Sequence, residues 1–264
     1  MIKPKIGFIG MNRQNILEDL YFAVENGFDY YEIQAARSEK DLNLEAKTIK
    51  EAKKIFSKNN ISLNLHSSYF ISPSSLQINV SKTAFKTIKE EIILANKIGA
   101  KQITIHSGSK EILNNEAIIA KNFEILIKNL KKIVKFGKKY GIKIGLENSL
   151  GIERLCRTPE DLLKVVNSVK ELGITFDIGH ANAAGFDLIQ FFKKIKNFII
   201  NIHLHDNNGK SDEHIQIGKG NINFKNFLRE CKKSGYYGPF ILEIFPCEER
   251  LKGKEIFFNI WNQV

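Results

Sequence analysis

The sequence predicts an α/β fold, a closed (β/α)8 barrel formed by a single domain over residues 1–264. Short apolar runs alternate from end to end with longer amphipathic segments, and eight of each occur. The runs are rich in Ile, Leu, Val and Phe, as is typical of parallel strands buried on both faces. A length of 264 residues suits one such barrel, which usually needs about 250 residues.

Each strand is expected where an apolar run of four to seven residues ends at a polar or glycine-containing segment. The expected strands are 5–9, 30–34, 61–66, 102–106, 142–147, 173–177, 199–205 and 240–244. An open, doubly wound sheet is the alternative architecture. It normally has a glycine-rich phosphate loop after the first strand, and the segment GFIGMNRQN matches that loop poorly.

Helices are expected between the strands, where apolar residues recur at spacings of three and four. The expected helices lie near 15–26, 45–58, 81–98, 115–140, 159–171, 187–196, 223–234 and 249–262. Thr158 followed by Pro159 is typical of a helix N-terminus. Glycines are typical of helix ends, and five are expected to act so here: Gly27, Gly99, Gly141, Gly173 and Gly235.

The composition argues against several classes of protein. No apolar stretch approaches the roughly 20 residues that a membrane span needs, so we expect no membrane partner. The N-terminal segment has no signal-peptide pattern, and we expect a cytoplasmic protein. Three cysteines without CxxC spacing favour plain thiols over disulfides or a cysteine-type zinc site.

The net charge of +11 is compatible with a polyanionic partner such as DNA or RNA. An equally good explanation is compositional, because only six of the 40 basic residues are Arg and Ile and Asn are abundant beside the lysines. Many of the lysines lie on the expected helices, where they coat a solvated face. The net charge alone is therefore only weak evidence for a nucleic-acid partner.

Imidazoles and carboxylates collect at the ends of the expected strands. The strand-end residues are His66, His106, Glu147, Asp177, His203 and Glu243. The carboxyl ends of the strands in such a barrel lie at one face, and the loops there build the active site. A buried carboxylate is costly unless it is paired or binds a metal. We therefore predict a divalent-metal site at this face.

Further candidate ligands lie close to these strand ends. Asp177 and His180 are three residues apart, so they place two ligand types on one turn. His203 and His205 are two apart and face the same side of their strand, and either one is a candidate ligand. Asp212 and His214 lie two residues apart in a polar loop. Alone this pair is weak evidence for a metal site, but it becomes stronger evidence beside the strand-end residues.

These motifs are similar to those of the endonuclease IV / xylose isomerase-like TIM barrel superfamily. The resemblance runs from Ile6 to Pro246 through HSSY (66–69), HSGS (106–109), LENS (146–149), DIGHANAAGFD (177–187), HLHD (203–206), DEHIQIGKGNI (212–222) and FILEI (240–244). It implies up to three Zn²⁺ ions. One is expected on His66, His106 and Glu147; a second on Glu147, Asp177, His203 and Glu243; a third on His180, Asp212 and His214.

The endonuclease resemblance implies a metal-dependent phosphodiester hydrolase acting at abasic sites in damaged DNA. Glu147 and Glu243 are the expected catalytic residues, and Tyr69, Arg37 and Lys219 the candidate DNA contacts. Against this interpretation, the first strand lacks the nuclease's His-Val-Ser segment, and the nuclease's recognition loop after the second strand is absent or reduced to Arg37.

The isomerase branch of the superfamily implies a metal-dependent sugar or sugar-phosphate isomerase or epimerase. One Mn²⁺, Mg²⁺ or Co²⁺ on Glu147, Asp177, His203 and Glu243 would then bind a small sugar substrate, while Glu147 and Glu243 exchange the proton. His180 and His205 would hold hydroxyls. A non-catalytic binding protein is a third possibility, although every ligand position is filled.

Overall fold

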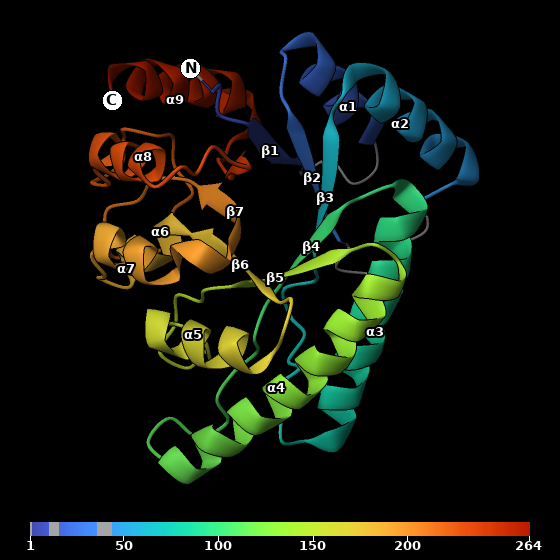
Figure 1. Cartoon of the computed structure of the whole chain (residues 1–264), viewed down its shortest axis with the longest axis vertical. Coiled ribbons are helices and arrows are strands. Elements are labelled where there is room, and N and C mark those ends of the chain that lie inside the picture. The colour runs from blue at the N-terminus through green and yellow to red at the C-terminus, as the bar shows by residue number, and fades with distance from the viewer. Residues whose placement is uncertain (1, 11–15, 36–43) are drawn as a thin grey trace.

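The structure, a computed structural model, describes residues 2–10, 16–35 and 44–264, and its strands form one closed parallel barrel in chain order (Figure 1). β1 pairs with β2 on one side and with β8 on the other, which closes the ring. The predicted barrel is therefore confirmed. The strands are β1 (Ile6–Gly10), β2 (Tyr30–Gln34), β3 (Ser62–His66), β4 (Gln102–Ile105), β5 (Lys143–Glu147), β6 (Gly173–Asp177), β7 (Ile199–Leu204) and β8 (Phe240–Leu242).

Helices surround the barrel close to the predicted positions. They are α1 (Ile16–Glu25), α2 (Ala46–Asn59), α3 (Ile78–Ile98), α4 (Glu116–Lys139), α5 (Pro159–Ser168), α7 (Leu188–Ile195), α8 (Phe224–Lys233) and α9 (Arg250–Gln263). The long helices α3 and α4 lie together on one side, and α7, α8 and α9 follow one another on the opposite side (Figure 1). Among the residues described, no helix is both long and apolar enough to cross a membrane.

The sequence did not predict helix α6 (Ile178–Ala183), which begins directly after β6. The Asp177 side chain caps it by accepting a hydrogen bond from the His180 backbone N–H at 2.7 Å. Asp177 is thus fixed by the local chain before any ligand binds. Two short 3₁₀ helices, Lys196–Phe198 and Cys247–Glu249, also lie outside the prediction.

Gly173 was expected to end a helix, and this prediction was wrong. Gly173 is the first residue of β6, and Glu171 adopts the left-handed backbone conformation instead, with φ of 68°. A Cβ on Gly173 would lie 2.6 Å from the side chain of Ile200. Ile200 occupies this space because the pairing of β6 and β7 shifts register at Ile174/Thr175. The glycine therefore makes room for a neighbouring strand.

Alternation along the strands separates the apolar core from the polar interior of the barrel. In β6, Phe176 points outward and packs on Phe191 of α7 and Phe227 of α8, with ring centroids 5.0 and 6.1 Å away. Thr175 points inward, and its hydroxyl lies 2.9 Å from that of Thr104 on β4. The outward faces hold the helices in place, and the inward faces leave polar groups for the barrel mouth.

Replacing a core aromatic tests this division. Phe176→Ala is expected to lower the free energy of unfolding by about 3–5 kcal/mol, because it removes a fully buried ring between two helices. Phe70→Ala is the matched control; its ring is 79% exposed, and the expected change is within about 0.5 kcal/mol. Urea unfolding followed by circular dichroism measures both. Equal losses for the two variants would contradict this account of the core.

Candidate metal centre

The structure brings the predicted ligand residues together at the carboxyl ends of the strands. His66, Glu147 and Asp177 are the last residues of β3, β5 and β6. His106 and Glu243 directly follow β4 and β8. All of these side chains are buried, although they belong to segments far apart in the chain.

The first group consists of His66, His106 and Glu147. Glu147 Oε2 lies 3.4 Å from His66 Nε2 and 3.2 Å from His106 Nδ1. The two imidazole rings have centroids 5.0 Å apart. One nitrogen or oxygen of each residue lies within 4.8 Å of the others, which is compact enough to hold one metal ion.

The second group consists of Glu147, Asp177, His203 and Glu243. His203 Nδ1 lies 3.0 Å from Glu147 Oε1, 3.1 Å from Glu243 Oε2 and 3.8 Å from Asp177 Oδ2. The four ligand atoms lie within 4.8 Å of one another, and all four residues are buried. Glu147 contributes one oxygen to each of the first two groups, so the groups are adjacent.

The third group lies nearer the surface, around Asp212. His214 Nε2 and His180 Nε2 lie 3.1 and 3.4 Å from Asp212 Oδ2. His205 Nε2 lies 3.5 Å from Asp212 Oδ1, and the His205 ring stacks on that of His214 with centroids 3.9 Å apart. The most compact set here is His205, Asp212 and His214, while the predicted His180 contacts the same carboxylate. Both His203 and His205 therefore face candidate ligand groups.

Burial and opposite charge act against each other on the pKa values of this centre. Burial favours neutral imidazole at His66, but Glu147, Glu243 and Glu32 outweigh it and raise the pKa of His66 to about 9. At His106 burial prevails and lowers the pKa to about 3. Burial also opposes ionisation of Glu147, yet the surrounding histidines hold the pKa of its carboxyl well below the usual range. The Glu147 carboxylate therefore remains charged.

Several buried ligand atoms lack a hydrogen bond among the described residues. They are Glu147 Oε2, Asp177 Oδ2, His106 Nε2 and His205 Nδ1. A buried polar atom without a partner costs about 1–3 kcal/mol, so natural proteins rarely leave several together. Imidazole nitrogens and carboxylate oxygens are the ligands that Zn²⁺, Mn²⁺ and Co²⁺ accept. The donor set therefore fits divalent metal ions.

Two buried carboxylates hold the loops that carry these ligands. Glu91 of α3 accepts hydrogen bonds from the Ser67 hydroxyl at 2.5 Å and from the Ser68 backbone N–H at 3.0 Å, next to His66. Asp206 accepts hydrogen bonds from four backbone N–H groups of the loop that carries Asp212 and His214, those of Asn207, Gly218, Gly220 and Ile222. The ligands are thus placed by rigid loops.

The predicted substrate contacts have different outcomes. The Tyr69 ring packs against His106, with centroids 4.9 Å apart, and is 46% exposed at the rim of the centre. Lys219 instead makes an ion pair of 2.8 Å with Glu249. Arg37 lies outside the described residues. Arg154, which the sequence did not single out, lies with its guanidinium carbon 4.6 Å from the Tyr69 ring centroid.

A cavity of about 400 Å³ opens over the centre. Its walls include His66, His106, Glu147 and Glu243, with Tyr69 and Phe70 among its exposed residues. A larger cavity of about 790 Å³ lies at the amino ends of β5 and β6, and no histidine lines it. The smaller cavity is the candidate substrate site, because it alone of the two contacts the ligand groups.

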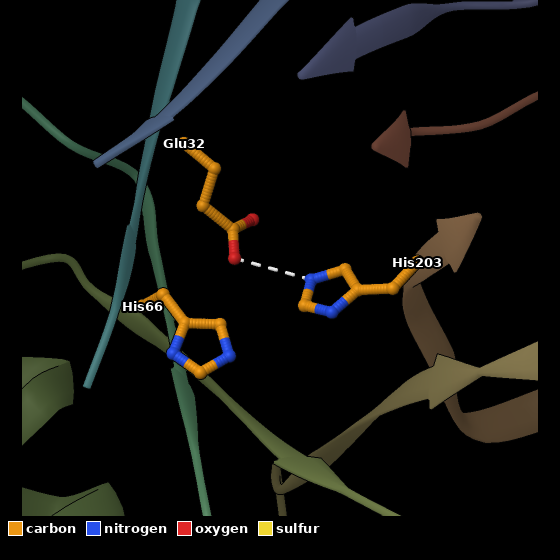
Figure 2. A group of neighbouring side chains, drawn as sticks. All are labelled: Glu32, His66 and His203. Atoms are coloured by element: carbon orange, nitrogen blue, oxygen red, sulfur yellow. Dashed lines mark hydrogen bonds and ion pairs between the residues drawn. The ribbon is translucent and has the colours of Figure 1, made fainter. Parts of the chain in front are cut away.

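Glu32, a fully buried carboxylate in the middle of β2, was not among the predicted site residues. Its Oε1 lies 3.1 Å from His203 Nε2 (Figure 2). The available signal was an acid inside the apolar run YYEIQ, a position that burial makes costly unless the acid has a partner.

Known proteins of two kinds resemble this chain. The uncharacterized protein MJ1311 of Methanocaldococcus jannaschii is 37% identical over 247 residues, which cover 88% of this chain and 80% of that protein. A probable endonuclease 4 of Shouchella clausii is 28% identical over 203 residues, covering 70% of this chain and 66% of that protein. The crystal structure of a D-tagatose 3-epimerase-like protein superposes with a TM-score of 0.86 and 32% identity, over 98% of each chain.

The family assignment follows from the extent of the match. The sequence profile described as "Xylose isomerase-like TIM barrel" matches residues 20–256, which include every candidate ligand. The predicted resemblance is thereby confirmed at the level of the family, and this chain belongs to the xylose isomerase-like TIM barrel family.

Proposed function

We propose that this protein is a metal-dependent phosphodiester hydrolase with a centre for three divalent cations, best filled by zinc, and that abasic-site DNA is its substrate. The observation that carries the proposal is the arrangement of ligand residues in three adjoining groups. Glu147 joins the first group to the second, and Asp177 joins the second to the third because its Oδ1 lies 3.2 Å from His205 Nε2.

The charge of the centre supports three cations and an anionic substrate. Five carboxylates contact the histidines of the centre: Glu32, Glu147, Asp177, Asp212 and Glu243. Histidine ligands are neutral when they bind metal. Three divalent cations would leave the centre one charge positive, whereas one cation would leave it three charges negative. A phosphodiester is attracted in the first case and repelled in the second.

Different side chains of the centre would have different roles in hydrolysis. Zinc ions on these residues would supply a water whose pKa is lowered toward about 7 and a positive counter-charge for the phosphate oxygens. Glu147 would bridge the first two ligand groups and fix their separation. Glu243 lines the cavity and would position the attacking water and accept its proton, since its carboxylate is anionic beside His203 and His214.

The rim of the cavity supports a nucleic-acid substrate. Tyr69 and Phe70 present aromatic rings to solvent, and unstacked bases pack on such rings. Arg154 donates a hydrogen bond to the Ser109 hydroxyl at 3.1 Å while it lies over Tyr69. Its remaining N–H donors are suited to a phosphate group next to the cleaved bond.

Sugar epimerisation is the second candidate, favoured by the close structural likeness to a D-tagatose 3-epimerase-like protein over 98% of each chain. One Mn²⁺, Mg²⁺ or Co²⁺ on Glu147, Asp177, His203 and Glu243 would suffice. Glu147 and Glu243 would exchange the proton, and His66, His106, Asp212 and His214 would contact the sugar. The two candidates differ in the number of cations bound.

Metal content and activity together test the proposal. Protein loaded with zinc and freed of excess metal is expected to contain about three zinc ions per chain and to incise a duplex with one abasic site. An undamaged duplex is the control substrate, and D-tagatose and D-fructose test the epimerase alternative. Fully loaded protein at micromolar concentration that leaves the abasic duplex intact would refute the proposal. One exchangeable ion together with ketose conversion would establish the alternative.

Asp177→Asn tests the shared ligand groups. Asparagine keeps the cap of α6 but removes the negative charge next to His203 and His205, so we expect the fold to persist while zinc content and incision fall. Asp161→Asn on α5 is the matched control, expected to behave like the wild type. The measurements are zinc per chain, initial incision rate and the circular dichroism spectrum. Full incision by Asp177→Asn would exclude this residue from the centre.

Arg154→Gln tests the phosphate contact. Loss of one cationic contact is expected to raise KM for the abasic duplex and to reduce the slope of log KM against log salt by about one. The catalytic rate at saturating DNA is expected to change less. Arg229→Gln on α8, where the arginine contacts only Asn226 among described partners, is the control for net charge. An unchanged salt slope in Arg154→Gln would place the DNA backbone elsewhere.

A further inference from the structure

Glu32 is a fully buried carboxylate for which the proposed hydrolysis has no direct use. It lies on β2 between His66 on β3 and His203 on β7 (Figure 2). Its Oε1 lies 3.1 Å from His203 Nε2. Its Oε2 accepts from the side-chain amides of Asn201 at 3.0 Å and Asn64 at 3.4 Å. Both carboxylate oxygens therefore already have partners within the barrel.

These contacts argue against a fourth cation between Glu32, His66 and His203, although their ligand atoms lie within 4.8 Å of one another. His66 is turned toward the first group, since its Nδ1 lies 3.0 Å from the Ser67 carbonyl oxygen and its Nε2 3.4 Å from Glu147. A cation at Glu32 would have to break the contact with His203 Nε2. The geometry is instead that of a hydrogen bond to His203 Nε2, the ring nitrogen that faces away from the second ligand group.

The two ring nitrogens of His203 face opposite sides. Nδ1 faces Glu147 and Glu243 at 3.0 and 3.1 Å, and Nε2 faces Glu32 and the side-chain amide nitrogen of Asn201 at 3.1 and 3.2 Å. A neutral imidazole carries one N–H and one lone pair, and only the nitrogen with the lone pair binds a cation. Of these two neighbours of Nε2, only the Glu32 carboxylate can accept a proton, since the Asn201 amide nitrogen is a donor that already bonds to Glu32 Oε2. With Nε2–H donated to Glu32, the lone pair is at Nδ1, toward the ligand group.

We infer that Glu32 is a positioning residue that holds His203 in the Nε2–H tautomer and so directs Nδ1 at the cation of the second group. The inference rests on the proposed cation centre but not on the choice of substrate, because His203 belongs to the ligand set of both candidate reactions. The amides of Asn64 and Asn201 fix the Glu32 carboxylate in turn. Removing such a hydrogen bond to a metal-binding histidine commonly lowers metal affinity about 10–100-fold.

The experiment compares variants of Glu32 for cation affinity. Glu32→Met removes the acceptor at similar volume, and zinc affinity, measured against a chromophoric chelator, is expected to fall about 10–100-fold. Glu32→Gln keeps an acceptor oxygen without the charge and is expected to bind with intermediate affinity. Asp19→Asn is the matched control; Asp19 is also a buried carboxylate, bound by Tyr31 and Arg250 at 3.0 and 3.1 Å. It is expected to lose stability but not zinc affinity.

The tautomer gives a readout that a merely structural residue would not move. In the zinc-loaded wild type, long-range ¹H–¹⁵N correlation spectra are expected to show a protonated Nε2 and a metal-bound Nδ1 on His203, and Glu32→Gln is expected to weaken this preference. A protonated Nδ1 in the wild type, or an anomalous-scattering peak between Glu32 and His203, would overturn the inference. The spectrum of the wild type decides the point even if Glu32→Met does not fold.

The outcome also separates this inference from the proposed function. Unchanged zinc affinity in Glu32→Met, with abasic-site incision intact in the wild type, would remove the inference and leave the function standing. Reduced zinc affinity in Glu32→Met, with no incision by the fully loaded wild type, would support the inference and refute the proposed function. Failure of the wild type to bind any divalent cation would overturn both.

Discussion

The need to balance buried negative charge governs this molecule. Glu147 and Asp177 are almost completely inaccessible to solvent, and an unpaired carboxylate in that position is strongly unfavourable. Burial favours neutral imidazole rings, but the neighbouring carboxylates raise the pKa values of His66, His180 and His203, so protons on these three rings offset part of the charge. Metal ions would replace those protons, since a ligating imidazole must present a lone pair. Cation binding would therefore release protons from these rings.

The barrel makes this concentration of charge possible by separating two faces of each strand. Phe176 and Thr175 are neighbours in β6, yet the first packs among helices and the second faces the barrel interior. The outward apolar contacts supply the stability that polar groups inside the barrel do not. Asp206 and Glu91 then anchor the loops above, so that the ligands are held before any cation arrives.

Local pattern was sufficient for the parts of this structure that depend on local chemistry. Apolar runs located the strands, and a histidine or acid at the end of a run, such as His106 or Glu243, located the mouth of the barrel. Glu32 was not predicted as a site residue because its role depends on His203. The two residues are 171 positions apart in the chain, and only the closed barrel brings them together. Gly173 was misassigned for the same reason, since its neighbour Ile200 comes from another strand.

The proposed function and its alternative use the overlapping ligand groups in different ways. Glu147, Asp177, His203 and Glu243 form a complete four-residue site on their own, which suits a single cation and a neutral sugar. His66 and His106 extend it on one side through Glu147, and Asp212 and His214 on the other through His205. Under the proposed function, a cation on each flanking group would turn a strongly negative pocket into one that attracts a phosphate. The proposed function and its alternative would therefore differ in whether the flanking histidines bind metal or substrate, and not in the fold.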